Sequence, residues 1–145
     1  MANDNLTLLL TAVLLTGCTG SPEKPPAGAA LPPCGPLPNC VNSESGSGGK
    51  AIDAIQASPR QWQALKSWIA GRDNWSITVD DGDFVQAVTT TPLMRYRDDV
   101  MLRFDSEDGV IQVRSSSRLG ISDMGANRER VERLRELVNL EQAKP

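Results

Sequence analysis

The fold of this 145-residue chain is constrained most by four short runs in which apolar or β-branched residues alternate with polar ones. The runs cover residues 75–79, 84–91, 100–104 and 110–115. Asp81-Gly82 and residues 106–109 have the composition of tight turns, and Pro92 breaks the chain after the second run. Strands joined by short connections pair antiparallel. The pattern therefore predicts a four-stranded antiparallel meander.

One amphipathic helix is expected before these strands in the sequence, and another after them. Ser58 can cap the first helix, Pro59 suits its first turn, and Gln61 completes a capping box. Gly71 is expected to end this helix. The second helix is expected over residues 128–141, where an apolar stripe consists of Val131, Leu134, Leu137 and Val138. The order of elements predicts an α+β fold, a single small domain whose N-terminal and C-terminal helices flank the meander.

The N-terminus has the features of an export signal. Residues 6–15 form an apolar run of about ten residues, the length of a signal-peptide core and about half the length of a membrane-spanning helix. The run ends in Leu15-Thr16-Gly17-Cys18, which resembles the lipobox of bacterial lipoproteins. In that motif the cysteine receives a lipid on sulfur and the preceding signal is removed. An ordinary secretory signal that contains a cysteine is the alternative, and residues 1–5 carry no Lys or Arg.

The lipobox resemblance implies a location as well as an anchor. Residues 1–17 would be removed, and the mature chain would be held in the cell envelope by the lipid on Cys18. Thr19 follows this cysteine, where an Asp would be the usual inner-membrane retention signal in enteric bacteria. By that analogy, the expected location is the outer membrane, on the side that faces the periplasm.

The segment that follows Cys18 is expected to be a spacer. Residues 18–33 include five prolines and no periodic apolar face, which favours an extended polyproline II conformation. Cys34 and Cys40 bracket a turn rich in Pro and Gly, and in an oxidising compartment such a pair predicts a short disulfide loop. A metal pair is the alternative, but the chain has no His to complete a zinc site with two thiolates. The folded domain is expected to span residues 34–145.

Charge balance and the absence of histidine exclude several classes of function. The chain has 15 Lys and Arg residues against 18 Asp and Glu, and removal of residues 1–17 takes away a single acidic group, Asp4. Nucleic-acid binding is not expected, because phosphates require a basic face. Without His, neither a Ser-His nor a Cys-His nucleophile can be built. We therefore expect no nucleic-acid partner, no metal site and no cofactor.

Residues 114–128 concentrate Arg, Ser, Asp and Gly between the last strand and the second helix. This segment resembles the signature of the bacterial family DUF1499, Arg-Ser-x-Ser-Arg-x-Gly-x-Ser-Asp-x-Gly-x-Asn-Arg, and matches it at every fixed position. Asp98-Asp99-Val100 and Pro38-Asn39-Cys40-Val41 match two further motifs of the family. The resemblance covers most of the expected domain, and it implies a family without a settled biochemical activity.

The polar residues of these motifs are the candidate site residues. They are Asp98, Asp99, Arg114, Ser115, Ser117, Arg118, Asp123, Asn127 and Arg128. In a structural interpretation, Asp–Arg pairs fix the long connection to the end of the sheet, and Asp123 or Asn127 caps the helix. In a binding interpretation, hydroxyls, loop amides and arginines converge near a helix N-terminus on a small anionic or carbohydrate ligand.

Two classes of function are compatible with this sequence. The first is a non-enzymatic binding or assembly module of the cell envelope, with a small ligand or an envelope protein as its partner. The alternative is an envelope hydrolase or transferase that acts through Asp98, Asp99 or Asp123. Arg114 and Arg118 would then assist the aspartate. Two carboxylates beside an open cleft would favour catalysis, whereas mutual pairing of the charged residues would favour a scaffold.

Overall fold

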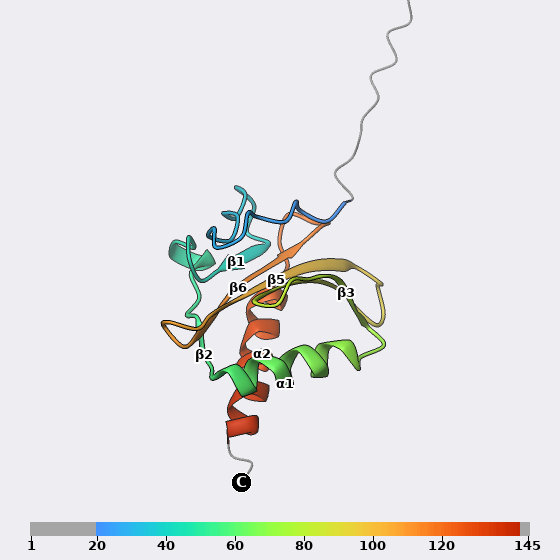
Figure 1. Ribbon diagram of the computed structural model, residues 1–145. Helices are drawn as coiled ribbons and strands as arrows, with labels where there is room; N and C mark the ends of the chain where they lie inside the picture. Colours follow the sequence, from blue (N-terminus) through green and yellow to red (C-terminus); the bar gives the residue numbers. More distant parts are fainter. Residues whose placement is uncertain (1–19, 143–145) are drawn as a thin grey trace, which may run out of the picture.

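A computed structural model describes residues 20–142 of the chain (Figure 1). The predictions made for residues 1–17 and Cys18 lie outside these residues. The strands are β1 (Cys40–Asn42), β2 (Ile55–Gln56), β3 (Trp75–Asp80), β4 (Phe84–Thr90), β5 (Arg97–Asp105) and β6 (Val110–Ser117). The helices are α1 (Pro59–Ala70), α2 (Ala126–Gln142) and the short 3-10 helix η1 (Gly48–Lys50). No helix in the described part of the chain is long and apolar enough to cross a membrane.

The strands form one sheet of six, in the order β1-β6-β5-β4-β3, with β2 also paired to β6. Each of these strand pairs is antiparallel. The expected count of four strands is therefore too low, because β1 and β2 were missed. These two strands have 3 and 2 residues, too few to show an alternating pattern in the sequence. They form because the edge of β6 that β5 does not occupy pairs with both of them.

A bulge redistributes the side chains of β3. The register with β4 shifts between Ile77 and Val79. Trp75 and Ile77 pack against the main core, whereas Val79 packs with Leu31 on the opposite face of the sheet. An extra residue in one strand turns the following side chains over, so the simple alternation of the sequence does not hold along the whole of β3.

Both long helices cover one face of the sheet (Figure 1). The predicted capping box of α1 is present, with the Ser58 N–H donating to Gln61 Oε1 at 2.8 Å and the Gln61 N–H to Ser58 Oγ at 3.4 Å. The core below the sheet is formed by apolar side chains of both helices and of the strands. It includes Trp62, Leu65, Ile69, Val85, Val100, Leu102, Ile111, Val113, Val131, Leu134 and Val138.

The N-terminal segment crosses the other face of the sheet (Figure 1). The Gln86 side-chain amide donates to the carbonyl of Pro22 at 2.8 Å, and the Asn42 amide donates to that of Pro32, also at 2.8 Å. Leu31 is only 2% exposed and packs against Phe84 and Met101. Residues 20–33 are thus packed on the sheet rather than extended as the free spacer that their composition suggested. Polar side chains of β1 and β4 bind the backbone carbonyls of this proline-rich segment.

The expected disulfide is present between Cys34 and Cys40, whose Cα atoms lie 5.7 Å apart. Cys40 is also the first residue of β1, which pairs with β6. The bridge therefore ties the end of the N-terminal segment to the edge of the sheet.

If residues 20–33 are part of the fold, Leu31→Ala should lower the free energy of unfolding by about 2–5 kcal/mol, the usual cost of removing a buried leucine. Leu37→Ala is the matched control, since Leu37 is 43% exposed and its loss should change stability by less than about 0.5 kcal/mol. Urea unfolding of the oxidised full chain measures both values. Equal stability of the two variants would show that the segment does not pack on the sheet.

Candidate functional site

The candidate site residues do not form one cluster, because β5 and β6 send neighbouring side chains to opposite faces of the sheet. Asp98 pairs with Ser117 and Asp99 with Ser116 in the register of the two strands. Asp98 therefore faces the helices, while Asp99 faces the N-terminal segment. The single cluster expected from the sequence is in fact two clusters, separated by the sheet.

The helix-side cluster joins β5, β6 and α2. Arg130 forms an ion pair with Asp98, and its Nη1 also donates to Ser115 Oγ at 2.8 Å and to Asn127 Oδ1 at 2.6 Å. The Asn127 side-chain amide donates to the carbonyl of Asn39 at 2.9 Å. Asn127 is completely buried, so these bonds satisfy polar groups that have no access to water.

Asp123 caps α2, as the structural interpretation required. Its carboxylate accepts hydrogen bonds from the backbone N–H groups of Asn127 at 2.8 Å and Gly125 at 3.1 Å. Burial tends to raise the pKa of Asp123, but these bonds and one from the Asn127 amide outweigh it and hold the pKa below the usual value. Asp123 thus remains an anion at the helix N-terminus, where it complements the helix dipole.

On the opposite face, Asp99 and Arg118 form a bidentate ion pair. Arg118 Nε donates to Asp99 Oδ2 and Arg118 Nη2 to Asp99 Oδ1, both at 2.8 Å. The hydrogen bond to Asp99 raises the pKa of Arg118, against the effect of partial burial. Such a planar double contact is a geometry that Arg provides and Lys does not.

Arg114 lies close by on the same face and is only 8% exposed. Its Nη1 donates to Ser116 Oγ at 2.7 Å, while its Nε is buried and has no hydrogen-bond partner among residues 20–142. Burial lowers the pKa of Arg114, and the attraction of Asp99 opposes this change. The Asp99 carboxylate therefore compensates the charge of two arginines.

The remaining candidate, Arg128, holds a neighbouring loop. Its Nη2 donates to the carbonyls of Gly49 at 3.1 Å and Ala51 at 2.6 Å. Together with Asp123 it lines a depression of about 510 Å³ beside the disulfide loop. Lys50, the other cation there, also donates to a backbone carbonyl, that of Gly35, at 2.5 Å. Both cations are thus used in fixing loops.

These contacts leave no two of the candidate carboxylates, Asp98, Asp99 and Asp123, together at an open cleft. Asp98 and Asp99 are 3% and 2% exposed, and each is bound by an arginine. A general acid or base must reach the proton that it transfers, directly or through one water. Within residues 20–142, no group of three or more Cys, Asp or Glu side chains could hold a metal ion. The geometry favours the structural interpretation of the motif residues.

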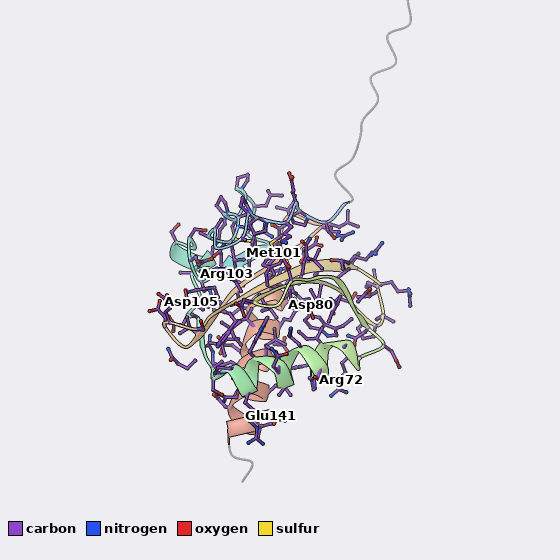
Figure 2. All side chains as sticks on the ribbon, in the orientation of Figure 1. Arg72, Asp80, Met101, Arg103, Asp105 and Glu141 are labelled. Atoms are coloured by element: carbon purple, nitrogen blue, oxygen red, sulfur yellow. A yellow bond between two sulfur atoms is a disulfide. The ribbon has the colours of Figure 1, made fainter. Side chains whose placement is uncertain are left out.

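An open pocket of about 550 Å³ lies between the end of α1 and the start of α2. Its walls are formed by Trp68, Arg72, Asn74, Trp75, Thr89, Thr90, Thr91, Pro92, Ala126, Glu129, Arg130, Arg133 and Leu134. Figure 2 shows Arg72 at the C-terminal end of α1, on the rim of the helix layer. The pocket combines three guanidinium groups, three threonines and two indole rings, and one carboxylate opposes these cations.

Arg72 is the cation of this pocket that is free to receive a ligand. Its guanidinium lies over the ring of Trp68, 4.5 Å from the centroid, and no ion pair holds it within the described residues. Among residues 20–142, Arg133 pairs only with Glu129, in a contact of 3.3 Å with both side chains well exposed. Arg130 is already engaged by Asp98. The indole N–H of Trp68 is buried and has no partner in the described part of the chain.

Sequence reasoning missed Arg130, Arg72 and Trp68. None of the three was among the candidate site residues, and Trp68 also packs against the main core. Arg130 follows Asn127 by three residues, so both lie on the same side of α2, and this spacing was the available signal. No local pattern indicated Arg72, because its position depends on where α1 ends relative to β4.

Arg118→Ala should lower the free energy of unfolding by about 3–5 kcal/mol, because it leaves the buried Asp99 carboxylate without its bidentate partner. Arg133→Ala is the control, since its exposed pair should contribute no more than about 1 kcal/mol. Chemical denaturation compares the two variants. Equal stability of Arg118→Ala and Arg133→Ala would contradict the structural role.

Comparison with known proteins agrees with the motifs. The profile of the family described as "Protein of unknown function (DUF1499)" matches residues 30–138, which include both clusters and every residue that lines the pocket. No curated protein and no solved structure matched the chain. The match covers well over half of the 145 residues, and the chain therefore belongs to the DUF1499 family.

Proposed function

We propose that this protein is a cell-envelope lipoprotein that acts by binding and not by catalysis. A lipid on Cys18 holds it at the periplasmic face of a membrane, the outer membrane by analogy with enteric lipoproteins. Its ligand is a small anion, a carbohydrate acid included, that enters the pocket between α1 and α2.

This proposal rests on a difference between two sets of charged residues, those of the family motifs and those of the pocket. The motif residues pair with one another or hold loops, and Asp98 and Asp99 are buried in separate ion pairs. The pocket, in contrast, presents Arg72 with no ion pair among residues 20–142, and Arg133 in a pair that water already weakens. A ligand anion can pair with a cation that is not already held in a buried ion pair.

The pocket chemistry supports a planar or acidic ligand. A guanidinium binds a carboxylate or phosphate through two parallel hydrogen bonds, and Thr hydroxyls add donors and acceptors. Trp68 and Trp75 meet edge to face, with ring centroids 6.2 Å apart, and provide an apolar wall. Such a combination of apolar walls with a few polar groups is usual in ligand sites.

The anchor is supported by the sequence of the N-terminus. Residues 6–15 have the length of a signal-peptide core, and Leu15-Thr16-Gly17-Cys18 resembles a lipobox. The disulfide of the domain fits an oxidising compartment such as the periplasm.

Cys18→Ser should abolish incorporation of labelled palmitate and release the protein from the membrane fraction, because a single acyl attachment site is lost. A matched control is the double variant Cys34→Ser with Cys40→Ser, which removes two cysteines and should keep the label. Mass spectrometry of the purified chains checks the same point. Unchanged labelling of the Cys18→Ser chain would refute the anchor.

Arg72→Ala should weaken binding of the ligand at least about tenfold, equivalent to about 1.4 kcal/mol, because it removes the uncommitted guanidinium. Thermal unfolding of the full chain is followed with inorganic phosphate, citrate and glucuronate, since a bound ligand raises the unfolding temperature. Arg60→Ala is the control, because Arg60 is an exposed cation at the other end of α1. The pocket is not the site if no anion stabilises the wild type, or if both variants respond equally.

A further inference from the structure

Two loops expose large apolar side chains to solvent. Leu93, Met94 and Tyr96 lie between β4 and β5, and Leu119, Ile121 and Met124 lie between β6 and α2. Their exposed fractions run from 46% for Tyr96 to 98% for Met124. A concentration of exposed apolar side chains on a small domain commonly marks a surface that contacts a partner or a membrane.

The two loops lie at the same end of the sheet. The β4–β5 loop begins after Thr90, which pairs with Arg97, and β5 pairs with the end of β6. The backbone N–H of Arg118, at the start of the second loop, donates to the carbonyl of Arg97 at 3.3 Å. We define the loop end as residues 91–97 and 118–125.

The chain also reaches the domain at the loop end. Arg118 Nη2 donates to the Ser21 hydroxyl at 2.6 Å, and Figure 1 shows the N-terminal segment arriving beside the end of β6. Cys18 precedes Ser21 by three residues. Three residues span at most about 11 Å, so a lipid on Cys18 would hold the loop end close to the bilayer surface. The packing of residues 20–33 on the sheet removes the longer spacer that would otherwise separate them.

The charge of the first loop suits a lipid surface. Residues 91–97 contain two arginines, Arg95 and Arg97, both exposed, and no acidic residue. Anionic headgroups attract such cations, and each basic residue close to the surface contributes about 1 kcal/mol. Apolar side chains next to arginines are the usual composition of a surface that rests in the interfacial region of a bilayer.

From these observations we propose that the loop end docks on the lipid bilayer, with Leu93, Met94, Leu119 and Ile121 in its interfacial region. This inference uses the lipid anchor of the proposed function, and it adds the orientation of the domain. The anchor supplies proximity, and the loops supply a second, weaker contact that fixes which end of the sheet meets the membrane. The face of the sheet that carries the helices is then roughly parallel to the membrane normal, and it does not lie against the bilayer.

The test uses the full chain in vesicles of phosphatidylcholine and phosphatidylglycerol. A cysteine introduced by Met94→Cys or by Ile121→Cys is labelled with an environment-sensitive fluorophore, and lipids that carry a quencher are added. The chain without either substitution reports any label on Cys18, Cys34 or Cys40. Glu107→Cys is the matched control, because Glu107 is exposed in the turn at the opposite end of β5 and β6. We expect quenching at positions 94 and 121 and none at 107.

The outcomes separate the docking from the anchor. Mass spectrometry of the same samples reports the lipid on Cys18. Quenching at positions 94 and 121 in a chain without the lipid would support docking and refute the anchor. A lipidated chain with no quenching at either position, or with equal quenching at 107, would overturn docking. Protection of the two probes that depends on protein concentration and not on vesicles would also overturn it, because a second copy of the chain would then cover the loops.

Discussion

The alternation of side chains along the paired strands β5 and β6 determines which face of the sheet Asp98, Asp99 and Arg114 of the family motifs occupy. Asp98 and Asp99 are neighbours in the chain, yet one belongs to the helix side and the other to the side of the N-terminal segment. Each carboxylate has been removed from water and requires its own arginine. The sheet thus carries a buried ion pair on each face. The Asp98–Arg130 pair connects the strands to α2, and Arg118 of the other pair also donates to Ser21 of the N-terminal segment.

The two ion pairs specify the arrangement of the layers more than they stabilise it. Desolvation of a buried pair offsets most of the attraction between the charges, whereas removal of one partner leaves an uncompensated charge. Arg130 can meet Asp98 only when α2 lies across β5 and β6. Arg118, the residue after β6, meets Asp99 of the neighbouring strand on the opposite face. Alternative packings of the same apolar residues would leave these charges buried and unpaired.

The N-terminal segment makes this sheet a three-layer structure. Leu31 packs with Met101 in the second apolar cluster. Arg103, which Figure 2 shows near Met101, forms an ion pair with Glu44. A domain of this size buries a limited apolar area under two helices. Covering the second face of the sheet adds to that area, and the disulfide limits the freedom of the unfolded chain at the same place.

Local patterns in the sequence determined the two helices, the capping box at Ser58, the disulfide partners and the four longer strands, because caps, turns and periodicity depend on residues close in the chain. The tertiary structure alone decided which residues of the Arg-rich segment meet. Arg130 and Asp98 are 32 residues apart, and their contact depends on strand register and helix position together. The same holds for β1, β2 and residues 20–33, which have too little periodicity of their own and acquire structure only against β6 and the sheet face. The pocket around Arg72 could not be predicted for the same reason, since residues of α1, β3, β4 and α2 form its walls.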